Sequence, residues 1–212
     1  MTTNLIRRAA TFTAAVGTLA LLAACGSSDS TAPAYGTLKV QLTDAPFSVD
    51  SISKVDIFVV RVDGRIADVD SATAAKGATS DSASINGWKT LATPNVSVNL
   101  LSYQNGQTLA LGQASVPAGS YQGFRLVIDP SKSSITLKNG IVFTSTSTPS
   151  ASFPSGATSG IKIQLTSPVV VAANGTTTMV VDFDVANSFV LRGNSLALNG
   201  LLFKPVIRAT VK

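Results

Sequence analysis

Apolar and polar residues alternate with a period of two over much of the chain after residue 35. Leu38, Val40 and Leu42 are separated by single polar residues, which places the three apolar side chains on one face of a β-strand. No segment beyond the N-terminal leader shows the 3.6-residue period of an amphipathic helix. Similar runs predict further strands over 55–62, 88–91, 96–101, 108–114, 122–129, 134–138, 141–144, 161–165, 169–172, 177–185 and 202–211.

Turn residues separate these runs. Asn and Gly tolerate the positive φ of tight hairpin turns, so Asn-Gly between two apolar runs is a strong hairpin signal. Asn139-Gly140 and Asn174-Gly175 are the clearest cases, and Asp63-Gly64 is predicted to end the second strand. Many short strands with regular turns predict an all-β fold, an antiparallel β-sandwich. The polar stretches 67–84 and 145–159 are expected to be surface loops, or binding loops at one end of the sandwich.

Composition supports strands and narrows the chemistry. All eleven acidic residues of the 212 are Asp, a residue of turns and caps, and there is no Glu. The absence of His removes the usual general base and zinc ligand, and a single Cys excludes an intramolecular disulfide. Basic residues are scattered although the formal charge is +5, so no nucleic-acid partner is expected.

The N-terminal 24 residues have the organisation of a secretory signal. Arg7 and Arg8 precede an apolar segment, 9–23, that is too short to span a bilayer. The site Leu22-Ala23-Ala24-Cys25 resembles the lipobox of bacterial lipoproteins. This resemblance implies cleavage before Cys25, diacylglycerol on its thiol and acylation of the new amino group. The alternative is an ordinary signal peptide with an incidental Cys.

The rest of the predicted organisation follows from Cys25. Residues 25–35 are expected to be the lipidated Cys and a flexible tether, and 36–212 the β-sandwich domain. Gly26 after the Cys resembles the outer-membrane default of such lipoproteins. We therefore expect the protein in the bacterial cell envelope, on the outer membrane, with the membrane as a partner through the lipid on Cys25. An envelope protein or a glycan is the further expected partner.

Several motifs of the predicted domain together resemble a domain-of-unknown-function family of bacterial lipoproteins. They are GTLKVQLTDAP at 36–46, VPAGSY at 116–121, RLVID at 125–129, PSG at 154–156, GIK at 160–162, DFDV at 182–185 and KPVIR at 204–208. The resemblance implies a β-sandwich of the transthyretin or immunoglobulin-like kind, with Greek-key connections. It implies no established activity.

Two carboxylates are candidate metal ligands. Asp182 and Asp184 stand two apart in a predicted strand, so their side chains point to one face. With Asp44 they are candidate ligands for Ca²⁺, which takes six to eight oxygens. The alternative is that they pair with arginines or cap strand ends.

Aromatic and arginine residues offer two further candidate sites. Trp88, Tyr103 and Tyr121 are candidates for stacking on a sugar; the alternative is packing, with Tyr121 pinning the Pro117–Tyr121 turn. A separate set of arginines within apolar strands forms either an anion site or buried-stem salt bridges; its members are Arg61, Arg125 and Arg208.

Together these observations predict a lipid-anchored, non-enzymatic module for binding, adhesion or structure, without a cofactor. The alternatives are a carbohydrate-binding lipoprotein that uses exposed aromatics and a Ca²⁺-stabilised surface domain.

Overall fold

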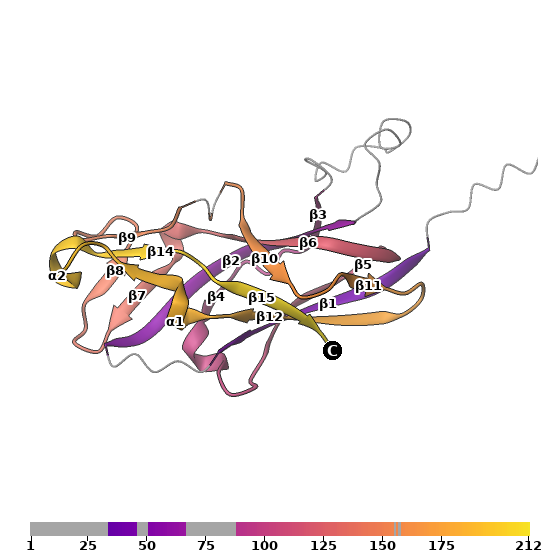
Figure 1. The fold of residues 1–212 in the computed structure, drawn as a ribbon, viewed down its shortest axis with the longest axis horizontal. Coiled ribbons are helices and arrows are strands. Elements are labelled where there is room, and N and C mark those ends of the chain that lie inside the picture. The colour runs from indigo at the N-terminus through magenta and orange to yellow at the C-terminus, as the bar shows by residue number, and fades with distance from the viewer. Residues whose placement is uncertain (1–33, 46–50, 67–87, 155, 157) are drawn as a thin grey trace, which may run out of the picture. The chain divides into compact units, whose positions relative to one another are not determined.

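A computed structural model describes residues 34–45, 51–66, 88–154, 156 and 158–212. These residues belong to one compact unit, Pro33–Lys212. Twelve strands form a large sheet, and three more form a small one (Figure 1). The strands of the large sheet are β1 (Tyr35–Asp44), β2 (Ile52–Ile66), β3 (Lys89–Ala92), β4 (Val96–Asn99), β5 (Leu109–Pro117), β6 (Gly119–Ile128), β7 (Ser134–Leu137), β8 (Val142–Thr144), β10 (Ile161–Leu165), β11 (Val169–Val171), β12 (Thr176–Phe183) and β15 (Ile207–Val211).

The large sheet curls around a single core. Its order is β5-β1-β12-β15-β10-β6-β2-β7-β8, with β11 paired to β6 and both β3 and β4 paired to β2. Strand β10 pairs with β15 on one side and with β6 on the other, so it joins the two halves. Leu38 and Val40 of one half and Ile57 and Leu126 of the other lie in the same buried cluster.

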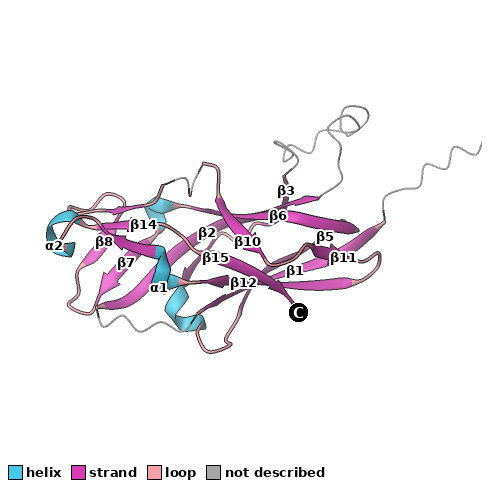
Figure 2. Cartoon of the chain, viewed as in Figure 1, coloured by secondary structure: helices cyan, strands magenta, loops and turns pink. Residues whose placement is uncertain are grey.

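The small sheet and four single helical turns complete the described chain. The sheet consists of β13 (Phe189–Leu191), β14 (Leu201–Phe203) and β9 (Ala151–Ser152). Figure 2 shows the helical turns at strand ends: the 3₁₀ turns η1 (Leu100–Tyr103) and η2 (Pro130–Lys132), and the helices α1 (Val185–Ser188) and α2 (Leu196–Asn199). In the described residues, no helix has the length and apolar character needed to cross a membrane.

The all-β prediction is confirmed, but the pairing is mixed rather than purely antiparallel. Three pairs are parallel: β1 with β12, β10 with β15, and β14 with β9. Alternation along a strand tells which side chains are buried, whereas the choice of neighbouring strand depends on long connections. The sequence pattern therefore predicted most strands without their order.

The two Asn-Gly turns for which a hairpin was clearest in the sequence have different outcomes. Asn139-Gly140 forms the predicted hairpin between β7 and β8: Leu137 N donates to Ile141 O at 2.8 Å, and Gly140 has a φ of +88°. Asn174-Gly175 does not form a hairpin, because β11 pairs with β6 whereas β12 pairs with β1. This turn carries the chain from one half of the curled sheet to the other.

The prediction that Asp63-Gly64 ends the second strand is wrong. Strand β2 continues to Ile66, and Gly64 faces the core. A Cβ at Gly64 would lie 2.8 Å from Leu91 Cδ1 and 3.0 Å from Phe124 Cε1, so the small residue permits close packing rather than a turn. Asp63 points to the opposite face, where it accepts hydrogen bonds from arginine side chains.

The Pro117–Tyr121 turn is pinned as the alternative interpretation of Tyr121 predicted. The Tyr121 hydroxyl donates to Pro117 O at 3.0 Å, and its ring stacks on Phe124 with 5.8 Å between ring centroids. Burial raises the pKa of Tyr121 to about 12, so the hydroxyl keeps its proton and remains a donor. The corner therefore fixes the start of β6.

Candidate functional site

One outer surface of the large sheet gathers four basic side chains. Arg61 and Arg65 alternate along β2 with Asp63 between them, so all three point away from the core. The strand register places Arg125 of β6 opposite Asp63, and Lys162 of β10 opposite Arg125. We name these residues, with Trp88 and Thr90 beside β2, the arginine face: Arg61, Asp63, Arg65, Trp88, Thr90, Arg125 and Lys162.

Asp63 is the hub of this surface. It is 1% exposed, and its carboxylate accepts from Arg61 Nε at 3.1 Å to each oxygen and from Arg125 Nε at 2.8 Å. Thr90 Oγ1 adds a third donor at 3.0 Å. A buried carboxylate with this many charge-assisted hydrogen bonds is held in one position, and it holds both guanidinium groups with it.

Trp88 lies among the arginines. The Arg125 guanidinium carbon is 4.8 Å from the centre of the indole ring, and that of Arg65 is 5.9 Å from it. Gly123 of β6 permits this approach, since a Cβ there would be 3.3 Å from Trp88 Cη2. The half-buried indole therefore acts as a support for cations through its π-face.

The sequence identified part of this surface. Arg61, Arg125 and Trp88 were candidates, but in two separate sites, and the structure joins them. Arg208 is not part of this group: it lies on β15 opposite Asp182. Asp63, Arg65 and Lys162 were missed. The spacing Arg61-Asp63-Arg65 would have revealed two of these residues if the strand had not been ended at Asp63.

The three candidate aromatics do not form one platform. Tyr121 is fully buried in the core, so the ligand-binding prediction for it is corrected to the structural role described above. Tyr103 lies in η1 at the far end of β1, where its carbonyl accepts from Thr43 Oγ1 at 2.9 Å. Trp88 alone of the three contacts the arginines.

The three candidate metal ligands lie near the ends of β1 and β12, and two of them, Asp44 and Asp184, make structural hydrogen bonds. Asp44 is 2% exposed and accepts from Gln104 Nε2 at 3.0 Å and from Val185 N at 3.3 Å. Asp184 caps α1 by accepting from Asn187 N at 3.1 Å. Among the described residues, no three acidic, His or Cys side chains are arranged to hold a metal ion. Asp44 and Asp184 thus use oxygens in these structural bonds, and the Ca²⁺ ligand set stays a prediction.

These carboxylates nevertheless affect one another. Burial raises the pKa of Asp182, with the charge of Asp184 adding to the rise and Arg208 opposing it. One oxygen of Asp182, Oδ1, is buried without a hydrogen-bond partner in the described chain. Burial likewise raises the pKa of Asp44 to about 6; its bonds to Gln104 and Val185 oppose this, and the two neighbouring carboxylates reinforce it.

Asp44 is expected to give the stability a measurable pH dependence. Its pKa is higher in the fold than the ordinary value of 3.8, so folding favours the protonated form. Its contribution is therefore greatest below about pH 4 and is lost as the pH rises to about 6. We expect Asp44→Asn to become more stable relative to the native chain across this window, by about 2 to 3 kcal/mol. Urea unfolding of both chains at a series of pH values tests this, and a difference that stays constant from pH 4 to 7 would contradict it.

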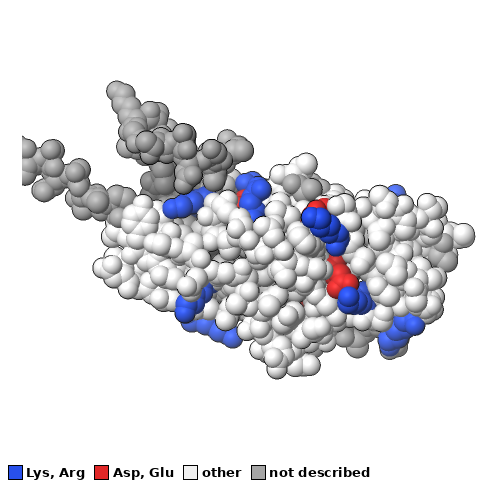
Figure 3. All heavy atoms as spheres, turned by 180° about the vertical axis from the view of Figure 1, so that it is seen from behind, with Lys and Arg blue, Asp and Glu red and all other residues white. Residues whose placement is uncertain are grey.

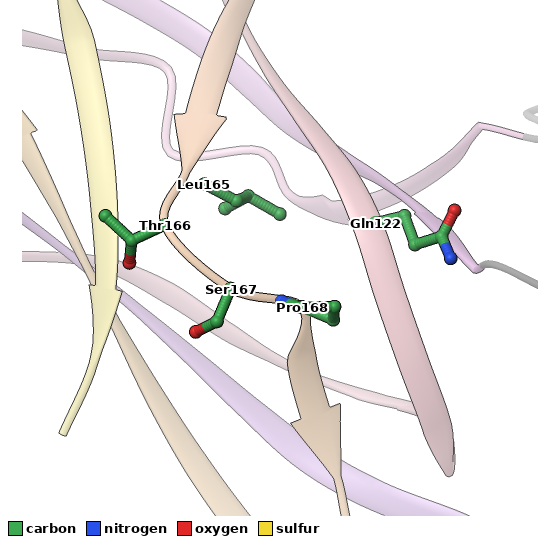
Figure 4. Close-up of a pocket in the computed structure, with 5 residues that line it drawn as sticks. All are labelled: Gln122, Leu165, Thr166, Ser167 and Pro168. Carbon is green, nitrogen blue, oxygen red and sulfur yellow. The ribbon is translucent and has the colours of Figure 1, made fainter.

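A shallow hollow of about 230 Å³ lies between β6 and the loop that joins β10 to β11. Its lining residues are neutral: Gln122, Leu165, Thr166, Ser167 and Pro168. Figure 4 shows Leu165 directed toward β6, whereas Thr166 and Ser167 point to the other side of the loop. No polar groups converge there, so this hollow is a weaker candidate than the arginine face.

Charged side chains are sparse on the rest of the visible surface. Figure 3 shows one side of the molecule with a few separate groups of basic and acidic side chains in a mostly uncharged surface. Surface pairs such as Lys54 with Asp56, at 2.7 Å, balance charge locally. The arginine face differs because its single carboxylate is buried beneath several cations. The predicted lipid-attachment residue, Cys25, lies outside the described residues.

Comparison with known proteins gives one match. Neither the curated proteins nor the solved structures contain a match to this chain. The profile of one family, described as "Domain of unknown function (DUF4382)", matches residues 35–205, which is nearly the whole described domain. The chain therefore belongs to the DUF4382 family of domains of unknown function.

Proposed function

We propose that this protein is a lipid-anchored binding module of the bacterial cell envelope that acts without catalysis. The observation that carries the binding role is the arginine face. A sheet surface that holds guanidinium groups in place through a buried carboxylate is suited to recognising an anionic partner, because little side-chain freedom is lost on binding. Asp44 and Asp184, by contrast, accept structural hydrogen bonds.

The anchor is supported by the sequence and by where the domain begins. The lipobox ends at Cys25, and β1 starts ten positions later at Tyr35. The nine residues between them reach at most about 30 Å when extended. Two or more acyl chains on Cys25 give stable membrane attachment, whereas a single chain does not. Gly26 favours the outer membrane as the location.

Replacing Cys25 by Ser tests the anchor. We expect the native chain to sediment with the membranes and to carry a mass increase of lipid size, because the thiol and the new amino group are acylated. Cys25→Ser is expected to lose both the added mass and the sedimentation. Ser27→Ala, a change two positions away that leaves the lipobox intact, is the control and should behave as the native chain. Membrane association of Cys25→Ser together with an unmodified mass of the native chain would exclude the proposal.

A further inference from the structure

The arginine face carries more positive charge than its own residues neutralise. Among the residues that the structure describes, it holds three arginines and Lys162 but only one carboxylate, Asp63. That carboxylate is occupied by the Nε atoms of Arg61 and Arg125. Within the described residues, the terminal nitrogens of Arg61 donate to nothing, and Arg65 has only its contact with Trp88. Donors thus remain for an external anion.

These donors are accessible and spread over an area. The side chain of Arg61 is 36% exposed, whereas that of Arg125 is only 16% exposed and its Nη1 donates to Ser159 O at 3.3 Å. Arg65 and Lys162 are exposed. Arg61 and Arg65 are about 13 Å apart along β2 at ~3.3 Å per residue, and Lys162 lies two strands away, about 10 Å at ~4.8 Å per strand. Cations at this spacing suit a ligand with several negative charges better than a single small ion.

The side chains around the arginine face indicate the class of ligand that it binds. Protein interfaces and membrane-binding surfaces usually include exposed apolar side chains as anchors. Most of the large exposed apolar side chains of the described residues lie elsewhere, around β8, β13 and α2. These are Ile141, Val142, Val190, Leu191 and Leu198. What lies beside the arginines is Trp88, a half-buried indole next to cationic donors.

We propose that the arginine face binds an acidic polysaccharide, with carboxylates on the free guanidinium nitrogens and Lys162 and a sugar ring against the edge of Trp88. Guanidinium groups match carboxylates in planar, two-point hydrogen bonds, and these bonds are charge-assisted. The inference rests on the proposed binding role and names its ligand class. It does not depend on the anchor, which is tested separately by cell fractionation.

The test uses the full chain, purified from membranes and kept in detergent, with polygalacturonate as the probe. Calorimetric titration is expected to show binding that weakens as salt is raised, because partly exposed charges are screened. Dextran, a neutral polysaccharide, should not bind. Stronger binding to polyaspartate or to phosphatidylglycerol vesicles than to polygalacturonate would assign the face to a protein or a membrane and overturn the inference.

Two matched double variants distinguish binding at the arginine face from a general effect of positive charge. Arg65→Gln with Lys162→Gln removes two cations of the face, neither of which bonds to Asp63, so thermal stability should be unchanged. We expect the affinity for polygalacturonate to fall about tenfold or more. Lys39→Gln with Lys138→Gln removes the same charge from exposed positions on β1 and at the β7–β8 turn, and should cost less than about twofold. Equal losses in both doubles, or no binding by the native chain, would refute the inference.

Discussion

Replacing Phe203 by Ala is expected to lower the free energy of unfolding by about 3 to 5 kcal/mol, the usual cost of removing a buried phenyl ring. Phe203 is 1% exposed and stands where the small sheet meets the large one. Its ring lies 5.2 Å from that of Phe153, 5.8 Å from Phe183 and 5.2 Å from Phe189, measured between centroids. Loss of the ring removes three aromatic contacts at once and leaves a cavity between the sheets.

Urea unfolding of the full chain measures this effect. The matched control is Leu198→Ala on α2, because Leu198 is 79% exposed and its truncation removes little buried surface. We expect this control to change the free energy of unfolding by less than about 0.5 kcal/mol. If Phe203→Ala were as mild as Leu198→Ala, the aromatic cluster would not be the link between the two sheets.

Replacing Gly200 by Ala is expected to cost at least about 3 kcal/mol and to disturb the small sheet. Gly200 ends α2 with a φ of 72° and a ψ of −158°, a conformation that only glycine adopts readily. An added Cβ would lie 2.2 Å from Ser150 O, the atom that accepts the hydrogen bond of Leu201 N at 3.1 Å. The backbone must move, and the register between β14 and β9 is lost with it.

Gly140→Ala measures the cost of a positive φ without the steric clash that Gly200→Ala adds. Gly140 also has a positive φ, of +88°, but nothing lies within 4 Å of the position that its Cβ would take. It therefore carries the conformational cost alone, about 1 to 2 kcal/mol. A similar loss of stability in Gly140→Ala and Gly200→Ala, measured by urea unfolding, would show that the contact with Ser150 O does not matter.

The sequence predicted the strands better than their partners. The Leu38-Val40-Leu42 alternation and the Asn139-Gly140 turn are local signals, and both were confirmed by β1 and the β7–β8 hairpin. The parallel neighbour of β1 is β12, more than a hundred residues later, and no local pattern reports such a pairing. The hairpin prediction for Asn174-Gly175 is wrong for the same reason: these residues suit a tight turn whether or not the two strands that they join pair with each other.

The candidate site was predicted in fragments. Arg61 and Arg125 are 64 positions apart in the sequence, and only the β2–β6 register shows that both reach Asp63. The Asp63-Gly64 pair was interpreted as a turn, which hid the acidic centre of the surface. The hydrogen bonds of the acidic candidates could not be predicted for a different reason. Alternation places Asp182 on an outer face, but no sequence pattern reports the backbone donors that bond to Asp44 and Asp184.

If the N-terminus is anchored as proposed, the position of β1 has a mechanical consequence. β1 lies between β5 and β12 and pairs with each at eight positions, with one register shift in the pairing to β5. Hydrogen bonds between strands lie across the strand direction. A pull at Tyr35 along β1 would therefore load both ladders in shear, with many bonds sharing the force instead of opening one after another. The strand that would receive tension from a tether is thus an interior strand of the sheet rather than an edge strand.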